Sequence, residues 1–192
     1  MADVQCDVLV IGASLGGVAA ALRAGAIGAT VSLVEPSGWL GGQMTGQGVC
    51  TPDENQYVTN GAYRVHPSEW AVGEAAGALA GFCSGSGVTT AAVLADAGLL
   101  RSYQKLLLGA GVPLFWWSDV PYGHPTFEAT QLLGVAQVFH GNGRDLSFDV
   151  DQVLTASDAQ ALLARAGLTI SFPQPNMTRG AAAFWLAGQL SM

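Results

Sequence analysis

The pattern of apolar and polar positions is most regular at the start of the chain. Residues 7–11 form a short, β-branched apolar run, which is typical of a buried parallel strand. A glycine-rich turn follows at 12–17, and the Ala-rich stretch 18–26 has the composition of a helix. A second β-branched run at 30–34 predicts another strand. The pattern therefore predicts a βαβ unit and an α/β fold class.

The turn and the end of the second run carry the residues of a dinucleotide-binding fingerprint. Gly12 permits a tight exit from the first strand, and Gly17 allows the helix to pack closely on the sheet. The middle glycine of the fingerprint is replaced by Ser14, which is small and can donate its own hydrogen bond. Glu35 lies 23 positions after Gly12, near the spacing that brings a carboxylate to a ribose. The alternative is a plain βαβ packing unit.

Two features of the sequence indicate which dinucleotide would bind. An acid at the end of the second strand repels a 2′-phosphate, so NADP is disfavoured. Gly41 and Gly42 then supply a glycine pair that lets the chain run close to the phosphates and ribitol of FAD. A surface turn is the alternative use of such a pair.

Downstream, the pattern is mainly helical. We expect helices at 75–82, 91–108 and 124–138, with a loop at 85–90. The aromatic run 112–117 predicts either a short strand or an aromatic plug in the core.

An internal repeat marks the C-terminal part. Segments 153–163 and 176–186 each place an apolar residue before a threonine, Thr155 or Thr178, and an apolar helix after it. The sequence thus predicts two domains: 1–100, with the nucleotide site, and 101–192, a helical region.

Composition narrows the class of protein. Half of the residues are hydrophobic and the mean hydropathy is +0.36, yet no run of about 18 apolar residues occurs, so we expect no membrane segment. A net charge of −7 argues against nucleic-acid partners. The three cysteines have no metal-like spacing, and no secretory signal pattern precedes the first strand. We expect a cytoplasmic protein with a small-molecule substrate.

Two blocks of the sequence resemble a known protein family. Residues 7–54, with Gly-Trp-Leu-Gly-Gly-Gln at 38–43, are similar to the start of FAD-dependent oxidoreductases, especially the bacterial set often labelled xanthan lyase. Residues 59–77 resemble a second block, which lies far downstream in full-length relatives. The resemblance implies that a long middle section is missing here and that the two blocks join near 53–57. The paired C-terminal helices resemble S-layer homology repeats, although each copy lacks part of the wall-binding signature; a packing or oligomerisation module is the preferred interpretation.

The resemblance also implies site residues. Glu74, next to Gly73, would bind the ribitol at the start of a helix, although a helix with an acid in its first turn explains the same pattern. Arg64 could anchor an anion and His66 could shuttle a proton, or both could be structural. The predicted cofactor-binding residues are Gly12, Ala13, Ser14, Leu15, Gly16, Gly17, Glu35, Pro36, Gly41, Gly42, Gln43, Gly73, Glu74 and Ala75.

Two functions remain open from the sequence. One is an FAD-binding oxidoreductase, or its flavin-binding core, which transfers hydride between a small organic substrate and FAD. The other is a non-catalytic remnant or interaction module with a dinucleotide-binding shape. Only two strands are clear, so an incomplete Rossmann-like sheet would leave an apolar face open and predicts self-association into a homo-oligomer.

Overall fold

The computed structural model describes residues 3–48, 66–141 and 145–192. The chain divides into two compact units, unit 1 (Met1–Leu107) and unit 2 (Leu108–Met192), which are described separately. No helix among these described residues combines the length and apolar character needed to cross a membrane.

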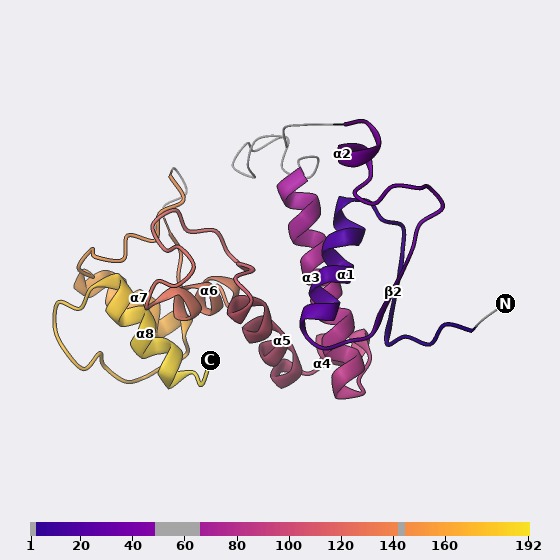
Figure 1. Cartoon of the computed structure of the whole chain (residues 1–192). Helices are drawn as coiled ribbons and strands as arrows, with labels where there is room; N and C mark the ends of the chain where they lie inside the picture. The colour runs from indigo at the N-terminus through magenta and orange to yellow at the C-terminus, as the bar shows by residue number, and fades with distance from the viewer. Residues whose placement is uncertain (1–2, 49–65, 142–144) are drawn as a thin grey trace. The chain divides into compact units, whose positions relative to one another are not determined.

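Unit 1 begins with the predicted βαβ unit. Strands β1 (Val8–Ile11) and β2 (Val31–Val34) are parallel and pair from Val8 with Val31 to Ile11 with Val34. Helix α1 (Leu15–Ala26) connects them and lies beside the sheet (Figure 1). The α/β class and this local arrangement are confirmed. The other elements of the unit are α2 (Gln43–Gly46), α3 (His66–Ser86), α4 (Thr90–Ala95) and α5 (Ala97–Gly109), the last of which ends in unit 2.

Helices α1 and α3 lie side by side with their backbones in contact (Figure 1). Gly73, Gly77 and Gly81 recur every four residues of α3 and form a column on the face toward α1. A Cβ atom at Gly73 would overlap the carbonyl oxygen of Gly16, and one at Gly77 would overlap that of Ala20. The column is therefore required by close packing, which no larger residue permits.

The start of α3 corrects the prediction of a helix at 75–82. The helix begins at His66, nine residues earlier, and runs to Ser86. Pro67 suits this position because the first turn of a helix leaves the backbone N–H groups without partners, and Glu69 places an acid in the same turn. Alanine content alone marked only the middle of the helix.

The predicted helix at 91–108 is two helices, α4 and α5, with a break at Asp96. The Oδ1 atom of Asp96 accepts hydrogen bonds from the backbone N–H of Gly98 (2.8 Å) and Leu99 (2.9 Å). An aspartate that caps backbone N–H groups in this way favours a new helix start over a continuous helix.

Unit 2 contains α6 (Phe127–Val135), α7 (Ala156–Arg165) and α8 (Arg179–Gln189) around an apolar core. Helix α6 is shorter than the predicted 124–138. The run 112–117 forms no strand: Phe115 stacks on Trp117, which meets Phe148 edge to face. The aromatic-plug interpretation of this run is therefore confirmed.

The internal repeat has the local structure that its threonines predict. The Oγ1 of Thr155 accepts a hydrogen bond from Asp158 N (3.1 Å), and the Oγ1 of Thr178 accepts one from Ala181 N (3.2 Å). Both residues are N-caps, of α7 and α8. An isolated antiparallel bridge between Val153 and Thr178 joins the two copies.

Arg179, in the first turn of α8, contacts the segments around residues 139–140 and 148 and so links them to this helix. Its Nε donates to the carbonyl oxygen of Phe148 (2.7 Å) and its Nη2 to that of His140 (2.7 Å). Its guanidinium also lies over the rings of Phe139 and Phe148, at 5.0 and 5.2 Å from their centroids. Desolvation lowers the pKa of Arg179, and Asp149 is the first of three nearby carboxylates that oppose this shift.

Candidate functional site

The glycine turn follows β1 directly. Gly12 has φ +93°, a left-handed conformation that L side chains rarely adopt, and its N–H donates to the carbonyl oxygen of Val34 (2.8 Å). A Cβ at Gly17 would overlap the carbonyl oxygen of Gly12 and reach Val10 at 3.7 Å. The close approach of helix and strand predicted for Gly17 is thus present.

Helix α1 presents its N-terminus beside this turn. Ser14 is the N-cap, and its Oγ accepts a hydrogen bond from Gly17 N (3.3 Å). We find no acceptor for the N–H groups of Leu15 and Gly16 among the described residues. These two donors and the positive end of the helix dipole suit a phosphate group.

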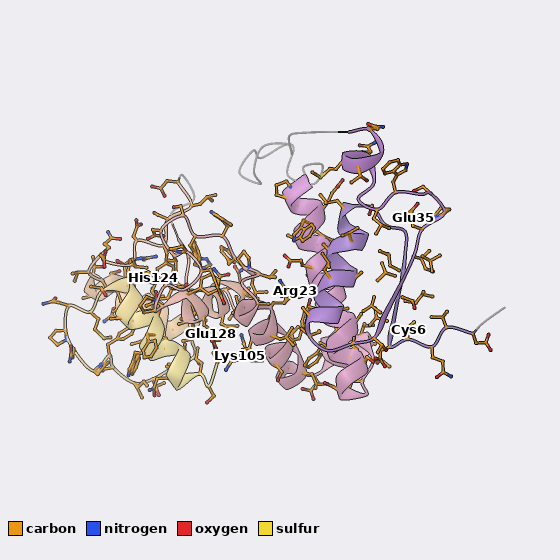
Figure 2. The ribbon with its side chains drawn as sticks, in the orientation of Figure 1. Cys6, Arg23, Glu35, Lys105, His124 and Glu128 are labelled. Carbon is orange, nitrogen blue, oxygen red and sulfur yellow. The ribbon has the colours of Figure 1, made fainter. Side chains whose placement is uncertain are left out.

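The Glu35 carboxylate lies at the glycine turn, beyond the end of β2 (Figure 2). Its Oε2 accepts a hydrogen bond from Ala13 N (2.6 Å), and its Oε1 accepts one from Ser37 N (2.9 Å). These bonds, that from Ala13 first, lower the pKa of Glu35 below its usual value of 4.5. The carboxylate is therefore ionised near neutral pH and keeps free lone pairs that can accept ribose hydroxyls.

The lowered pKa leads to a prediction for pH. A group with a depressed pKa contributes above its unfolded value and loses that contribution as the pH falls through its folded value. We therefore expect any interaction that needs the Glu35 carboxylate to be constant from pH 8 to pH 5 and to weaken only below pH 4.5. Nucleotide titrations across this range would test it; a decline centred near pH 6 would contradict it.

The glycine pair that follows Glu35 packs on the same turn. Gly41 N donates to the carbonyl oxygen of Ala13 (2.7 Å). Gly42 has φ +59°, and a Cβ there would meet Ser14 Cα at 3.2 Å. The structure thus brings the segments 12–17 and 35–42 together at the carboxyl edge of the sheet, with Pro36 and Gln43 exposed beside them.

The second predicted block contacts α1 instead. Glu74 forms an ion pair with Arg23 of α1, whose Nε lies 3.2 Å from Glu74 Oε1 (Figure 2 labels Arg23). Ala75 accepts a hydrogen bond at its carbonyl oxygen from the Tyr103 hydroxyl (2.9 Å). The predicted helix start at Gly73–Ala75 is wrong, because these residues lie inside α3; their helix dipole and free N–H groups are not available there.

The two predicted catalytic residues are not both described. Arg64 lies outside the described residues, and His66 is described only as the first residue of α3. Two residues that bond to predicted site residues, Ser37 to Glu35 and Arg23 to Glu74, were not predicted from the sequence. Ser37 holds Glu35 through its backbone, which leaves no signal in residue type, whereas Arg23 could have been found as the one charged residue of α1.

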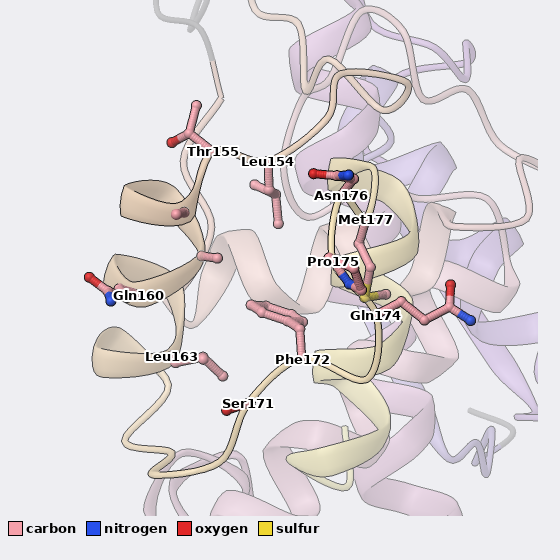
Figure 3. Close-up of a pocket in the computed structure, with 12 residues that line it drawn as sticks. Leu154, Thr155, Gln160, Leu163, Ser171, Phe172, Gln174, Pro175, Asn176 and Met177 are labelled. Atoms are coloured by element: carbon pink, nitrogen blue, oxygen red, sulfur yellow. The ribbon is translucent and has the colours of Figure 1, made fainter.

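Unit 2 has a cleft of its own. It measures about 410 Å³ and lies between α7 and residues 171–177, which Figure 3 shows facing each other. Leu163 and Phe172 form its apolar part, and Gln160 and Asn176 its polar part; none of its lining residues is charged. None of the predicted site residues lies in this unit.

The chain matches the FAD dependent oxidoreductase family over residues 7–59 and 55–107, which together exceed half of its length. It therefore belongs to this family, whose cofactor is FAD. No curated protein and no solved structure matches it.

Proposed function

We propose that unit 1 binds the ADP half of FAD at the carboxyl edge of β1 and β2, in a Rossmann-like manner. The observation that carries this proposal is the placement of Glu35, whose carboxylate is held by Ala13 N at the glycine turn. Membership in a family that uses FAD supports the choice of cofactor. The turn also fits the group sterically, because Gly12 and Gly17 place no side chain between helix and strand.

Each part of the site has a separate task. The N–H groups of Leu15 and Gly16 donate to the pyrophosphate, where the helix dipole also favours negative charge. The Glu35 carboxylate accepts the hydroxyl hydrogens of the adenosine ribose. Ser37 and Ala13 hold the carboxylate in place before the nucleotide arrives, so its orientation costs little on binding.

The bound flavin supplies hydride transfer to or from a small organic substrate. Arg64 and His66 are proposed to serve the substrate, as an anion anchor and a proton carrier. The family match in two segments that overlap at 55–59 supports a join between two blocks of a longer family protein. The two threonine-capped helices of unit 2 support a repeat module of the S-layer homology-like kind.

Replacing Glu35 with alanine tests the site. Hydrogen bonds to a charged group contribute about 1.5–3 kcal/mol, so Glu35→Ala should weaken FAD binding between about tenfold and a hundredfold. Quenching of flavin fluorescence on titration gives the affinity, and ADP-ribose should compete for the same site. Asp3→Ala removes the same charge from an exposed position and should leave the affinity unchanged. Equal affinities of both variants would refute the ribose role.

A second candidate function is supported by the open face of the sheet. Val10 faces Gly17 of α1, so alternation along the strand places the buried Val8 on the same face and turns Leu9 and Ile11 away from the helix. Leu9, Ile11 and Val34 are 56%, 80% and 52% exposed. Parallel sheets are usually covered on both faces, so this face favours a module that associates with a second copy or another protein. Sedimentation of the purified chain, with and without FAD, separates the candidates: a stable oligomer that takes up no FAD favours the module.

A further inference from the structure

An aromatic cavity in unit 2 is lined by none of the predicted site residues. It measures about 250 Å³ and is lined by eleven residues, none of them charged. Two ring pairs contribute to its wall. Phe115 stacks on Trp117 at 4.6 Å between centroids, and Tyr122 meets Phe127 edge to face at 5.6 Å. The cavity is therefore suited to a flat, uncharged ring.

Gln131 is one of the polar side chains in this mainly aromatic lining. Gln131 is only 1% exposed and lies on α6. Its Oε1 accepts hydrogen bonds from the backbone N–H of Leu114 (2.9 Å) and Phe115 (2.6 Å). Because two donors meet the oxygen, the orientation of the amide is fixed and the other atom must be the NH₂ group.

The NH₂ group of Gln131 indicates which ligand chemistry the cavity can recognise. We find no acceptor for Nε2 among the described residues, although the residue is almost wholly buried and lines the cavity. Because Gln131 lines the cavity and its NH₂ group has no acceptor there, that group can donate a hydrogen bond to a ligand acceptor in the cavity. We propose that the cavity binds a small uncharged ring compound whose carbonyl oxygen accepts a hydrogen bond from Gln131 Nε2.

The size of the cavity limits the ligand. Its volume lies below the range of about 300–1,000 Å³ typical of drug-sized ligands, so it takes roughly a single ring with one substituent. The absence of cationic side chains in the lining disfavours anionic ligands, because none of the lining residues would compensate their desolvation. The proposal does not rest on FAD binding, which is proposed for unit 1.

Three ring compounds of equal heavy-atom number test the proposal on the full chain. Acetophenone carries the carbonyl oxygen. Cumene has a methyl group in place of that oxygen, and benzoate has an anionic oxygen in place of the methyl group of acetophenone. We expect acetophenone to bind about tenfold more tightly than cumene, and benzoate more weakly than acetophenone. The indole N–H signals of Trp116 and Trp117 in ¹H–¹⁵N spectra report the binding. Equal affinities for acetophenone and cumene, or no shift of either signal at millimolar concentrations, would overturn the proposal.

A substitution assigns the preference to Gln131. Gln131→Glu keeps a carboxylate oxygen for the two backbone N–H groups but replaces the donor with an acceptor. At pH 8 the tenfold preference for acetophenone over cumene should fall to about one. Gln160→Glu makes the same change at an exposed position on α7 and should keep the preference. If Gln131→Glu does not fold, the three-compound comparison in the wild-type chain still decides; a preference that survives in a folded variant contradicts the role of Gln131.

Discussion

Gly77→Ala should destabilise unit 1 by about 2–3 kcal/mol although it adds a single methyl group. A Cβ at this position would overlap the carbonyl oxygen of Ala20 in α1. Backbone atoms cannot rotate away as a side chain does, so the helices must separate along their length. Overpacking a tight contact typically costs about 1–3 kcal/mol, and backbone obstruction places this variant at the upper end. Urea unfolding followed by circular dichroism measures the loss.

The same helix supplies the control. Gly85 also lies in α3, but a Cβ there would meet nothing within 4 Å. Because alanine is favoured over glycine inside a helix, Gly85→Ala should raise the free energy of unfolding by roughly 0.5–1 kcal/mol. Opposite signs for two identical substitutions would establish that the contact with α1 causes the effect. A similar small gain at Gly77 would show that α1 and α3 are not in backbone contact.

Arg179→Lys should destabilise unit 2 by about 2–4 kcal/mol although it keeps the charge. The arginine donates to the carbonyl oxygens of His140 and Phe148, and its planar guanidinium lies over two rings. A lysine ammonium is a compact point charge and cannot make both bonds from that position. At least one carbonyl oxygen loses its partner, and the ring contacts weaken.

Arg165→Lys is the matched control for this variant. Arg165 is exposed and donates from Nε to one carbonyl oxygen, that of Val138 (2.8 Å). Its replacement should cost less than about 1 kcal/mol. Thermal unfolding, followed by the near-ultraviolet signal of the aromatic core, distinguishes the two. Equal losses at both positions would show that the two-point contact of Arg179 adds nothing.

The sequence predicts the N-terminal part of the fold well because its signals are local. A strand, a glycine turn and a helix follow one another without a gap, and the distance from Gly12 to Glu35 places the acid at the same edge of the sheet. The threonine caps at 155 and 178 are local in the same sense, since each side chain bonds to a residue three positions later.

The sequence predictions were wrong or incomplete where the local structure depends on a residue far away in the chain. The glycine at position 73 resembles the start of a helix, but it lies inside α3 and packs against Gly16, which is 57 residues away. The ion pair of Glu74 with Arg23 was also not predicted, and the role proposed for Glu74 at the ribitol stays a prediction. Nothing in the neighbourhood of either residue signals α1 as the partner. The spacing of glycines by four along α3 could have predicted this contact, because such a column of small residues is typical of closely packed helices.

The contact between α1 and α3 also bears on how the length of this chain can vary. The two helices are joined through β2, α2 and residues 47–65, so their pairing closes a loop in the chain. The entropy of closing a flexible loop grows only with the logarithm of its length, by about 0.6 kcal/mol for each doubling. The contact between the glycine column and α1 does not depend on the length of the segment between α2 and α3. A long flexible insertion in this segment would therefore cost the helix pair little stability.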